Sequence, residues 1–223
     1  MNRKKTGQLL KLEKQKTNKA SEMVSLGSSD QETFDLDSLG NNEEFKQIQE
    51  IAKECGFQNV QLIRTKDIVV AHWVGLKCRY GCANYNKSWC CPPVAPDIRM
   101  TKELLGEYQL ALLLIKDTQD EDSCRNSTAK RRLQAKRWKG TLALERKLLL
   151  RGYHKAFGLP AETCALCKTC SYPEPCKFPS EKRPSVEACS IDIMATVRQV
   201  SLGKRLELDG QDRCDSYSLI LLM

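Results

Sequence analysis

Twelve cysteines occur in this chain of 223 residues, and seven of them form two runs with the spacing of metal ligands. The carboxy-terminal run is Cys164-x2-Cys167-x2-Cys170-x5-Cys176. Three thiols at successive three-residue intervals allow one short loop to ligate three corners of a [4Fe–4S] cube, as at the start of the bacterial ferredoxin run. The last spacer is longer than in ferredoxins, so the run predicts a cluster but not a ferredoxin fold.

The amino-terminal run is Cys78-x3-Cys82-x8-Cys91. Gly81 allows the backbone to turn tightly between the first two thiols. Two prolines follow Cys91, and proline often follows the last ligand of such a run. For that reason we choose Cys91, rather than its neighbour Cys90, as the third ligand.

The number of predicted ligands leaves the cluster count open. Seven thiols are one short of the eight that two all-cysteine cubanes require, so we expect one or two [4Fe–4S] clusters. The fourth ligand of the amino-terminal site could be Cys90, Cys176, Cys189 or a group from outside the protein, or one loop could be purely structural. An open iron would favour an enzyme over an electron carrier.

Zinc is the alternative metal. All-cysteine zinc sites usually join two CxxC knuckles from separate places, and here CxxC occurs only within the carboxy-terminal run. That distribution favours iron–sulfur. A zinc-organised module that binds nucleic acid is the weakest alternative, because few aromatic residues, essentially Trp138 and Tyr153, accompany the basic ones.

Arg183 is the candidate cofactor-binding residue outside the cysteines. It follows the carboxy-terminal run at the start of an expected helix, where its charge and the helix amino terminus would favour a cluster of net negative charge. A surface arginine at a helix start is the simpler interpretation. Glu145, the one acid among eleven Lys and Arg in residues 125–155, is expected to be ordinary surface charge.

The net charge of +8 is concentrated in this basic segment and in the first thirty residues. A basic helix of this kind could dock an acidic redox partner protein. The sequence contains no nucleotide-binding or hydrolase motif, so we expect electrons to come from a separate protein. The function predicted first is therefore electron transfer, or redox support of a partner enzyme.

The cysteines also indicate the compartment. No apolar stretch has the length of a signal peptide or a membrane span, and clustered cysteines in a reducing compartment are typically metal ligands. We therefore expect a cytoplasmic protein that does not contact a membrane.

Hydrophobic periodicity predicts one domain after a polar tail. Residues 1–41 are too polar to fold alone and are expected to be disordered, while residues 42–223 form a single cysteine-rich domain. Helices are expected at about 42–55, 97–105, 128–156 and 186–200. Strands are expected at 60–64, 68–74, 110–116 and 217–222, the first two as a hairpin. The pattern predicts an α+β fold, a small mostly antiparallel sheet packed with about four helices.

Two stretches, residues 75–96 and 157–183, show neither helical nor strand periodicity. Structureless loops of this length are uncommon inside a compact domain unless something orders them. Each contains one of the cysteine runs, so we expect two irregular metal-binding loops in which metal supplies the order.

Four segments together resemble a prokaryotic family of predicted metal-binding proteins of unknown function: LKCRYGCANYNKSWCCPP, LERKLLLRGYHKAFGL, CALCKTC and RPSVEACSIDIMATVR. The resemblance covers about residues 43–222. It implies a metal site at the cysteines already chosen and gives no reaction or partner. Ser190 stands where EACGID-like sequences would have glycine.

Overall fold

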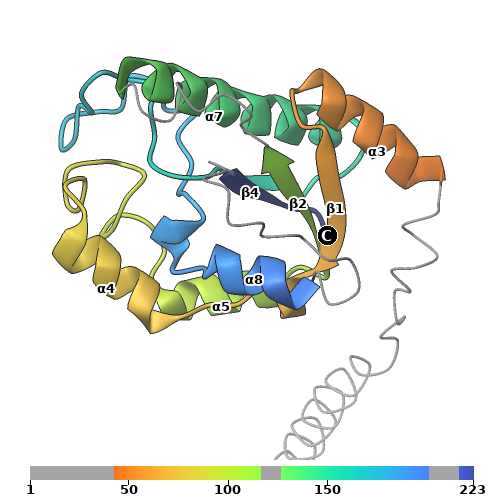
Figure 1. The fold of residues 1–223 in the computed structure, drawn as a ribbon, viewed down its shortest axis with the longest axis horizontal. Coiled ribbons are helices and arrows are strands. Elements are labelled where there is room, and N and C mark those ends of the chain that lie inside the picture. Colours follow the sequence, from red (N-terminus) through yellow and green to blue (C-terminus); the bar gives the residue numbers. More distant parts are fainter. Residues whose placement is uncertain (1–42, 117–126, 201–215) are drawn as a thin grey trace, which may run out of the picture. The chain divides into compact units, whose positions relative to one another are not determined.

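A four-stranded antiparallel sheet in the order β1-β2-β4-β3 forms the centre of the fold (Figure 1). The computed structural model describes residues 43–116, 127–200 and 216–223, and the predicted tail lies outside them. The strands are β1 (Asn59–Arg64), β2 (Leu110–Lys116), β3 (Phe157–Leu159) and β4 (Ser216–Leu221). β2 pairs with β1 and β4, and β4 pairs with β3.

Helices cover both faces of this sheet. Helices α3 (Glu43–Glu54) and α7 (Ser127–Leu150) lie on one side, and α5 (Ile98–Gly106) and α8 (Ile193–Val200) lie on the other (Figure 1). Because side chains alternate across a strand, Leu112 and Leu114 of β2 pack with α3 and α7, while Leu113 packs with α5 and α8. This double burial explains why β2 is almost uniformly apolar.

The α+β class is confirmed, with five α-helices in the described part of the chain. The fifth, α4 (His72–Gly81), replaces the second strand of the expected hairpin. Residues 65–67 form a 3₁₀ turn, and Val70 makes only an isolated bridge with Ile191. Ile68 is buried in the core, so its β-rich segment serves tertiary packing rather than a ladder, and the hairpin prediction is wrong.

Two predicted helices end differently in the structure. α7 stops at Leu150, because Gly152 adopts a positive φ of 101° that reverses the chain. The helix expected at 186–200 is divided: a 3₁₀ turn covers Glu187–Cys189, Ser190 has a left-handed φ of 59°, and α8 begins at Ile193. Asp192 caps α8 by accepting a hydrogen bond from Ala195 N at 2.9 Å.

The two cysteine-rich stretches are only partly irregular. α4 continues through Cys78 and ends at Gly81, whereas residues 82–97 contain no regular helix or strand. The second stretch begins with β3, which the sequence did not predict, and continues as an irregular segment, residues 160–183, which we call the cysteine loop. None of the described helices is both long and apolar enough to span a bilayer.

Candidate metal centre

Five thiols line one cavity, which we call the five-thiol pocket. They belong to all four cysteines of the carboxy-terminal run and to one cysteine from the amino-terminal stretch: Cys90, Cys164, Cys167, Cys170 and Cys176. The space between them measures about 30 Å³, so a cubane enters only if lining side chains move outward. Phe178 also lines this pocket and is 38% exposed, which leaves it room to do so.

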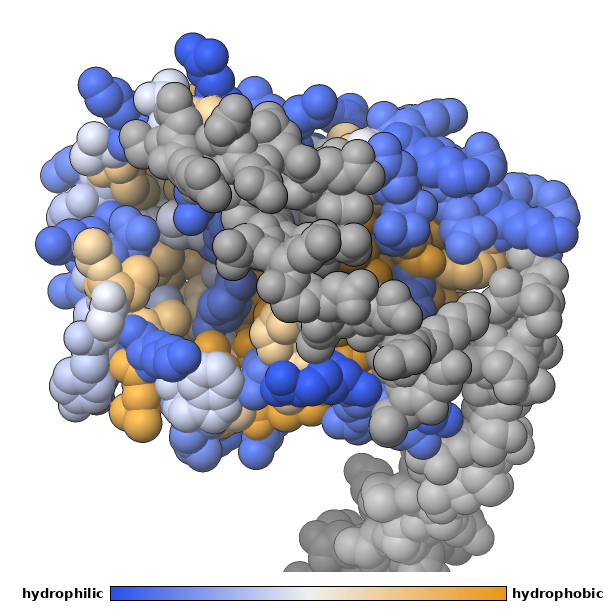
Figure 2. Space-filling model, in the orientation of Figure 1, coloured by the Kyte–Doolittle hydropathy of each residue, from blue (hydrophilic) through white to orange (hydrophobic). Residues whose placement is uncertain are grey.

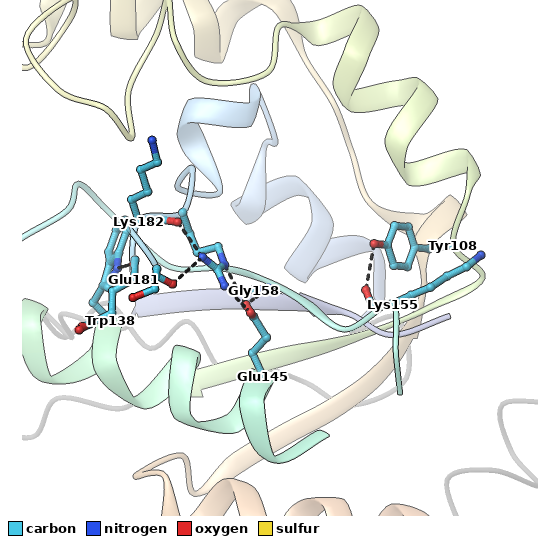
Figure 3. Close-up of polar contacts among 9 residues, drawn as sticks. Tyr108, Trp138, Glu145, Lys155, Gly158, Glu181 and Lys182 are labelled. Carbon is cyan, nitrogen blue, oxygen red and sulfur yellow. Dashed lines mark hydrogen bonds and ion pairs between the residues drawn. The ribbon is translucent and has the colours of Figure 1, made fainter. Parts of the chain in front are cut away.

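Helix α7 holds the cysteine loop through hydrogen bonds to its backbone. Three side chains on successive turns of the helix donate to carbonyl oxygens of the loop: Arg131 to Ala165 at 3.2 Å and Gln134 to Thr163 at 2.6 Å, and Trp138 to Glu181 at 3.0 Å (Figure 3). A loop without regular structure has unpaired backbone groups, and these side chains satisfy part of that need. The helix therefore helps to position the loop.

Glu145 of α7 binds β3, the strand just before this loop, and Arg183, the last residue of the loop. Its Oε2 accepts hydrogen bonds from Gly158 N at 2.7 Å and Arg183 Nε at 3.0 Å, and Arg183 Nη2 lies 2.5 Å from Oε1 (Figure 3). The Glu145 side chain is 6% exposed and that of Arg183 is 19% exposed. The expectation that Glu145 is ordinary surface charge is therefore wrong.

Arg183 contacts the five-thiol pocket through a hydrogen bond from its backbone to Cys90, not through its side chain. Its guanidinium binds Glu145 and the carbonyl oxygens of Ser180 and Lys182, and its role toward a cofactor stays a prediction. A backbone hydrogen bond from Arg183 favours the thiolate form of Cys90. The residue is thus a support for the pocket.

The amino-terminal run lines a second cavity, the three-thiol pocket, with Cys78, Cys82 and Cys91. Cys78 lies in the last turn of α4 and Cys82 follows its end, so a separation of four residues keeps both thiols on one side. The cavity measures about 430 Å³. Its other walls come from the segment after α4, from α7, from the cysteine loop, and from the 3₁₀ turn Glu187–Cys189 with a residue just before it: Asn84, Tyr85, Pro92, Lys130, Gln134, Glu162, Thr163, Ser185, Glu187 and Ala188.

The adjacent residues Cys90 and Cys91 belong to different pockets. Cys90 lines the five-thiol pocket and Cys91 the three-thiol pocket. Thr163 and Cys164 are divided in the same way, and Thr163 Oγ1 lies 3.5 Å from Cys91 Sγ. The two pockets therefore share a wall, which is formed by two pairs of adjacent residues: Cys90 with Cys91, and Thr163 with Cys164.

The alternatives for a fourth amino-terminal ligand can now be located. Cys176 and Cys90 both line the other pocket. Cys189 is fully buried and packs in the core with residues of α5 and α8. Among the residues that the structure describes, the three-thiol pocket therefore has only the three thiols chosen from the sequence.

The protonation of the thiols differs between the pockets. A hydrogen bond between Cys90 and Cys164 raises the pKa of Cys90 and lowers the pKa of Cys164 to about 7. In the three-thiol pocket, burial raises the pKa of Cys78 and of Cys91, and nearby thiolates add to both shifts. Three crowded thiolates need a positive centre to remain ionised, so this donor set fits a metal or cluster.

The sequence predicted the thiols but not the side chains opposite them. Lys130, Gln134 and Glu187 line the three-thiol pocket, yet no motif marks them, because they come from two segments far apart in the sequence, α7 and the 3₁₀ turn Glu187–Cys189. Glu187 accepts a hydrogen bond from Glu162 N at 3.1 Å, which joins this turn to the cysteine loop. Across the described ranges, no three Cys, His, Asp or Glu side chains converge closely enough to hold a single metal ion.

Fold and site together define a cysteine-rich metal-binding protein. The chain belongs to the family described as predicted metal-binding protein (DUF2284), whose model matches residues 61–222. The match contains both cysteine runs, and it confirms the resemblance noted in the sequence. Comparison with curated proteins and with solved structures gave no match.

Proposed function

We propose that this metal-binding protein is an iron–sulfur protein that transfers electrons, with a [4Fe–4S] cluster in the five-thiol pocket. The observation that carries the proposal is the set of five thiols around one cavity, three of them spaced as CxxCxxC. Four thiolates from this set, Cys164, Cys167, Cys170 and Cys176, would hold the cluster. When bound, it would supply one-electron redox chemistry.

Zinc remains the second candidate, because a single ion needs less space than a cubane and the five-thiol pocket is small. Tetrahedral zinc would require four sulfurs about 3.8 Å apart, given a Zn–S distance of about 2.3 Å. The described side chains do not converge in this way. The thiols are spread around a cavity, so they are better placed to bind the several irons of a cluster than to bind one ion.

The shared wall between the pockets supports a path for electrons. Cys90 and Cys91 are consecutive, as are Thr163 and Cys164, so a centre in one pocket lies close to the other. A second cluster held by Cys78, Cys82 and Cys91 would be reached through this wall. The protein would then carry electrons from a partner, through the five-thiol pocket, to the three-thiol pocket.

The exposed basic surface of α7 favours an acidic redox protein as the partner. The described surface over α7 and α3 is mostly hydrophilic (Figure 2), and α7 has exposed basic residues, among them Arg132, Lys136 and Lys139. The same helix holds the cysteine loop, so a partner bound there would lie near the five-thiol pocket. Electrostatic attraction of this kind speeds association and weakens with salt.

The partner surface can be tested with an acidic ferredoxin as the electron donor. Reversing two charges, Lys136→Glu with Lys139→Glu, should slow reduction of the protein at low salt by about tenfold. The matched control is Lys102→Glu, an exposed lysine on α5 across the sheet. Equal rates for both variants would remove α7 as the docking surface.

The proposed cofactor also bears on the compartment. None of the ten described cysteines forms a disulfide, and oxygen-sensitive clusters and free thiols persist in reducing compartments. We therefore propose that the protein is cytoplasmic.

Metal content decides the function. Protein purified without oxygen should contain iron and acid-labile sulfide in equal amounts, with about four irons for each cluster. The reduced protein should give an EPR signal. A colourless protein that contains zinc and no sulfide would refute the iron–sulfur function.

A further inference from the structure

The three-thiol pocket has much more room than its thiols need. Its cavity of about 430 Å³ lies in the range of small-molecule sites. Cys78, Cys82 and Cys91 line it together with Lys130 and Gln134 of α7. A cluster bound by the three thiols would leave space beside it, bounded by polar side chains.

Three thiolates cannot ligate all four irons of a cubane. Of the other described cysteines, five line the second pocket, Cys189 is buried in the core and Cys55 follows α3. A cluster held by the described thiols would therefore have one iron open to another donor atom, which can bind a ligand as a Lewis acid does.

The polar groups of the cavity indicate the charge of that ligand. The Glu162 carboxylate lies 3.6 Å from Arg137 Nη1, and the Glu187 carboxylate accepts a hydrogen bond from Glu162 N at 3.1 Å. Both carboxylates thus already interact with positively charged or N–H groups of the protein. Lys130 is exposed, lines the same cavity, and is the cationic side chain among the described lining residues. A ligand with a negative group would be attracted to it.

We propose that the three-thiol pocket binds a small carboxylate-bearing molecule, which places a donor atom on the open iron and its carboxylate beside Lys130. The proposal rests on the iron–sulfur function proposed above. The three-thiol pocket would then be a substrate or effector site. Electrons from the five-thiol pocket would be delivered to the cluster that binds this ligand.

Two small thiols that differ in one group test the role of the carboxylate. Cysteine and cysteamine share the thiol and the amine, but only cysteine has a carboxylate. Titration of the reduced, cluster-loaded full chain should change its EPR signal with both compounds, and cysteine should bind about fivefold more tightly, as a partly exposed ion pair allows. Lys130→Gln should abolish that preference, whereas the matched control Lys102→Gln on α5 should retain it.

The outcomes separate the two proposals. If iron and sulfide are present but neither compound changes the EPR signal, no iron is open and the ligand proposal is overturned, while the iron–sulfur function stands. Equal affinities for cysteine and cysteamine in the unmodified chain overturn the part assigned to Lys130. Protein without iron overturns the function itself.

Cys124 and Cys214 provide the sharpest check, since both lie outside the described residues. Cys124→Ser and Cys214→Ser should each leave the iron content and the response to cysteine unchanged. Loss of about four irons in either variant would identify the substituted cysteine as the fourth ligand, and the open iron would be ruled out. The free chain without clusters should bind neither compound, so binding there would also contradict the proposal.

Discussion

The two pockets differ in how the chain builds them and in the space that they leave. The five-thiol pocket takes four of its thiols from thirteen consecutive residues, 164–176, and encloses about 30 Å³. The three-thiol pocket draws its walls from α4 and the segment 82–92 after it, from α7, from the cysteine loop and from the region of the 3₁₀ turn Glu187–Cys189, and it encloses about 430 Å³. One pocket is a local loop around a small space, and the other is a cavity between separate elements.

This difference suggests a division of work. A centre in the small five-thiol pocket can exchange electrons, but the pocket leaves no space beside it for a substrate. A centre with three protein ligands beside a large polar cavity can bind one. The wall shared through Cys90–Cys91 and Thr163–Cys164 connects the two, so the smaller pocket could serve the larger.

The largest expected effect is a separate loss of iron from each pocket. Cys167→Ser should remove the cluster of the five-thiol pocket, and Cys91→Ser that of the three-thiol pocket, so each variant should lose about four of about eight irons. Cys55→Ser is the matched control, because Cys55 lines neither pocket. Iron and sulfide analysis measures the loss. If both variants lost all their iron, the two pockets would form a single centre.

The next prediction concerns stability. Glu145→Gln should lower the free energy of unfolding by about 3 kcal/mol, because Arg183 would keep a largely buried charge without its partner. Glutamine can still accept the hydrogen bond from Gly158, so the change isolates the ion pair. Urea denaturation of the cluster-loaded protein measures it.

The same variant distinguishes the pockets. Glu145 binds Gly158 just before the cysteine loop and Arg183 at the end of the loop, so in this variant a chelator should remove iron faster from the five-thiol pocket than from the three-thiol pocket. The control is Glu54→Gln, which breaks the exposed pair with Lys147 and should change neither property. Equal effects of the two variants would show that the buried pair does not hold the loop.

A smaller effect should decide between the two candidate fourth ligands of the five-thiol pocket. The hydrogen bond to Cys164 raises the pKa of Cys90 and so keeps its proton, which favours Cys176 as the ligand. Cys90→Ser should retain the iron of this pocket, and Cys176→Ser should lose part of it. The reverse result would exchange their roles.

The smallest effect is a difference in thiol reactivity in the metal-free chain. The pKa of Cys164 is lowered to about 7, so its alkylation should rise as the pH increases through about 7, because the thiolate is the nucleophile. Burial raises the pKa of Cys91, so its alkylation should begin at higher pH. Mass spectrometry of alkylated peptides resolves the two sites.

The variant Cys90→Ala provides the control for this titration. It removes the hydrogen bond that lowers the Cys164 pKa, so the midpoint for Cys164 should move up toward about 8.5, the value of an ordinary thiol. The midpoint for Cys91 should change little. An unchanged midpoint for Cys164 would show that Cys90 does not set its ionisation.

Much of the fold was predictable because its periodicity is strong. The repeat of Phe45, Ile48 and Ile51 predicted α3, and the apolar run at 110–116 predicted β2. The hairpin prediction failed because the β-branched residues Ile68 and Val70 pack against the core that includes α8 instead of pairing along a strand. β3 has only three residues, too few for a periodic signal.

The sequence by itself determined which thiols form the two runs, since close spacing along a chain forces ligands of a run to be neighbours. It did not determine the partition of Cys90 and Cys91, because the direction of adjacent side chains depends on the backbone around them. Nor did it reveal that Glu145 binds Gly158 and Arg183, thirteen and 38 residues away. Contacts at such separations leave no local pattern, so only the tertiary structure could place α7 against the cysteine loop and open a cavity beside three thiols.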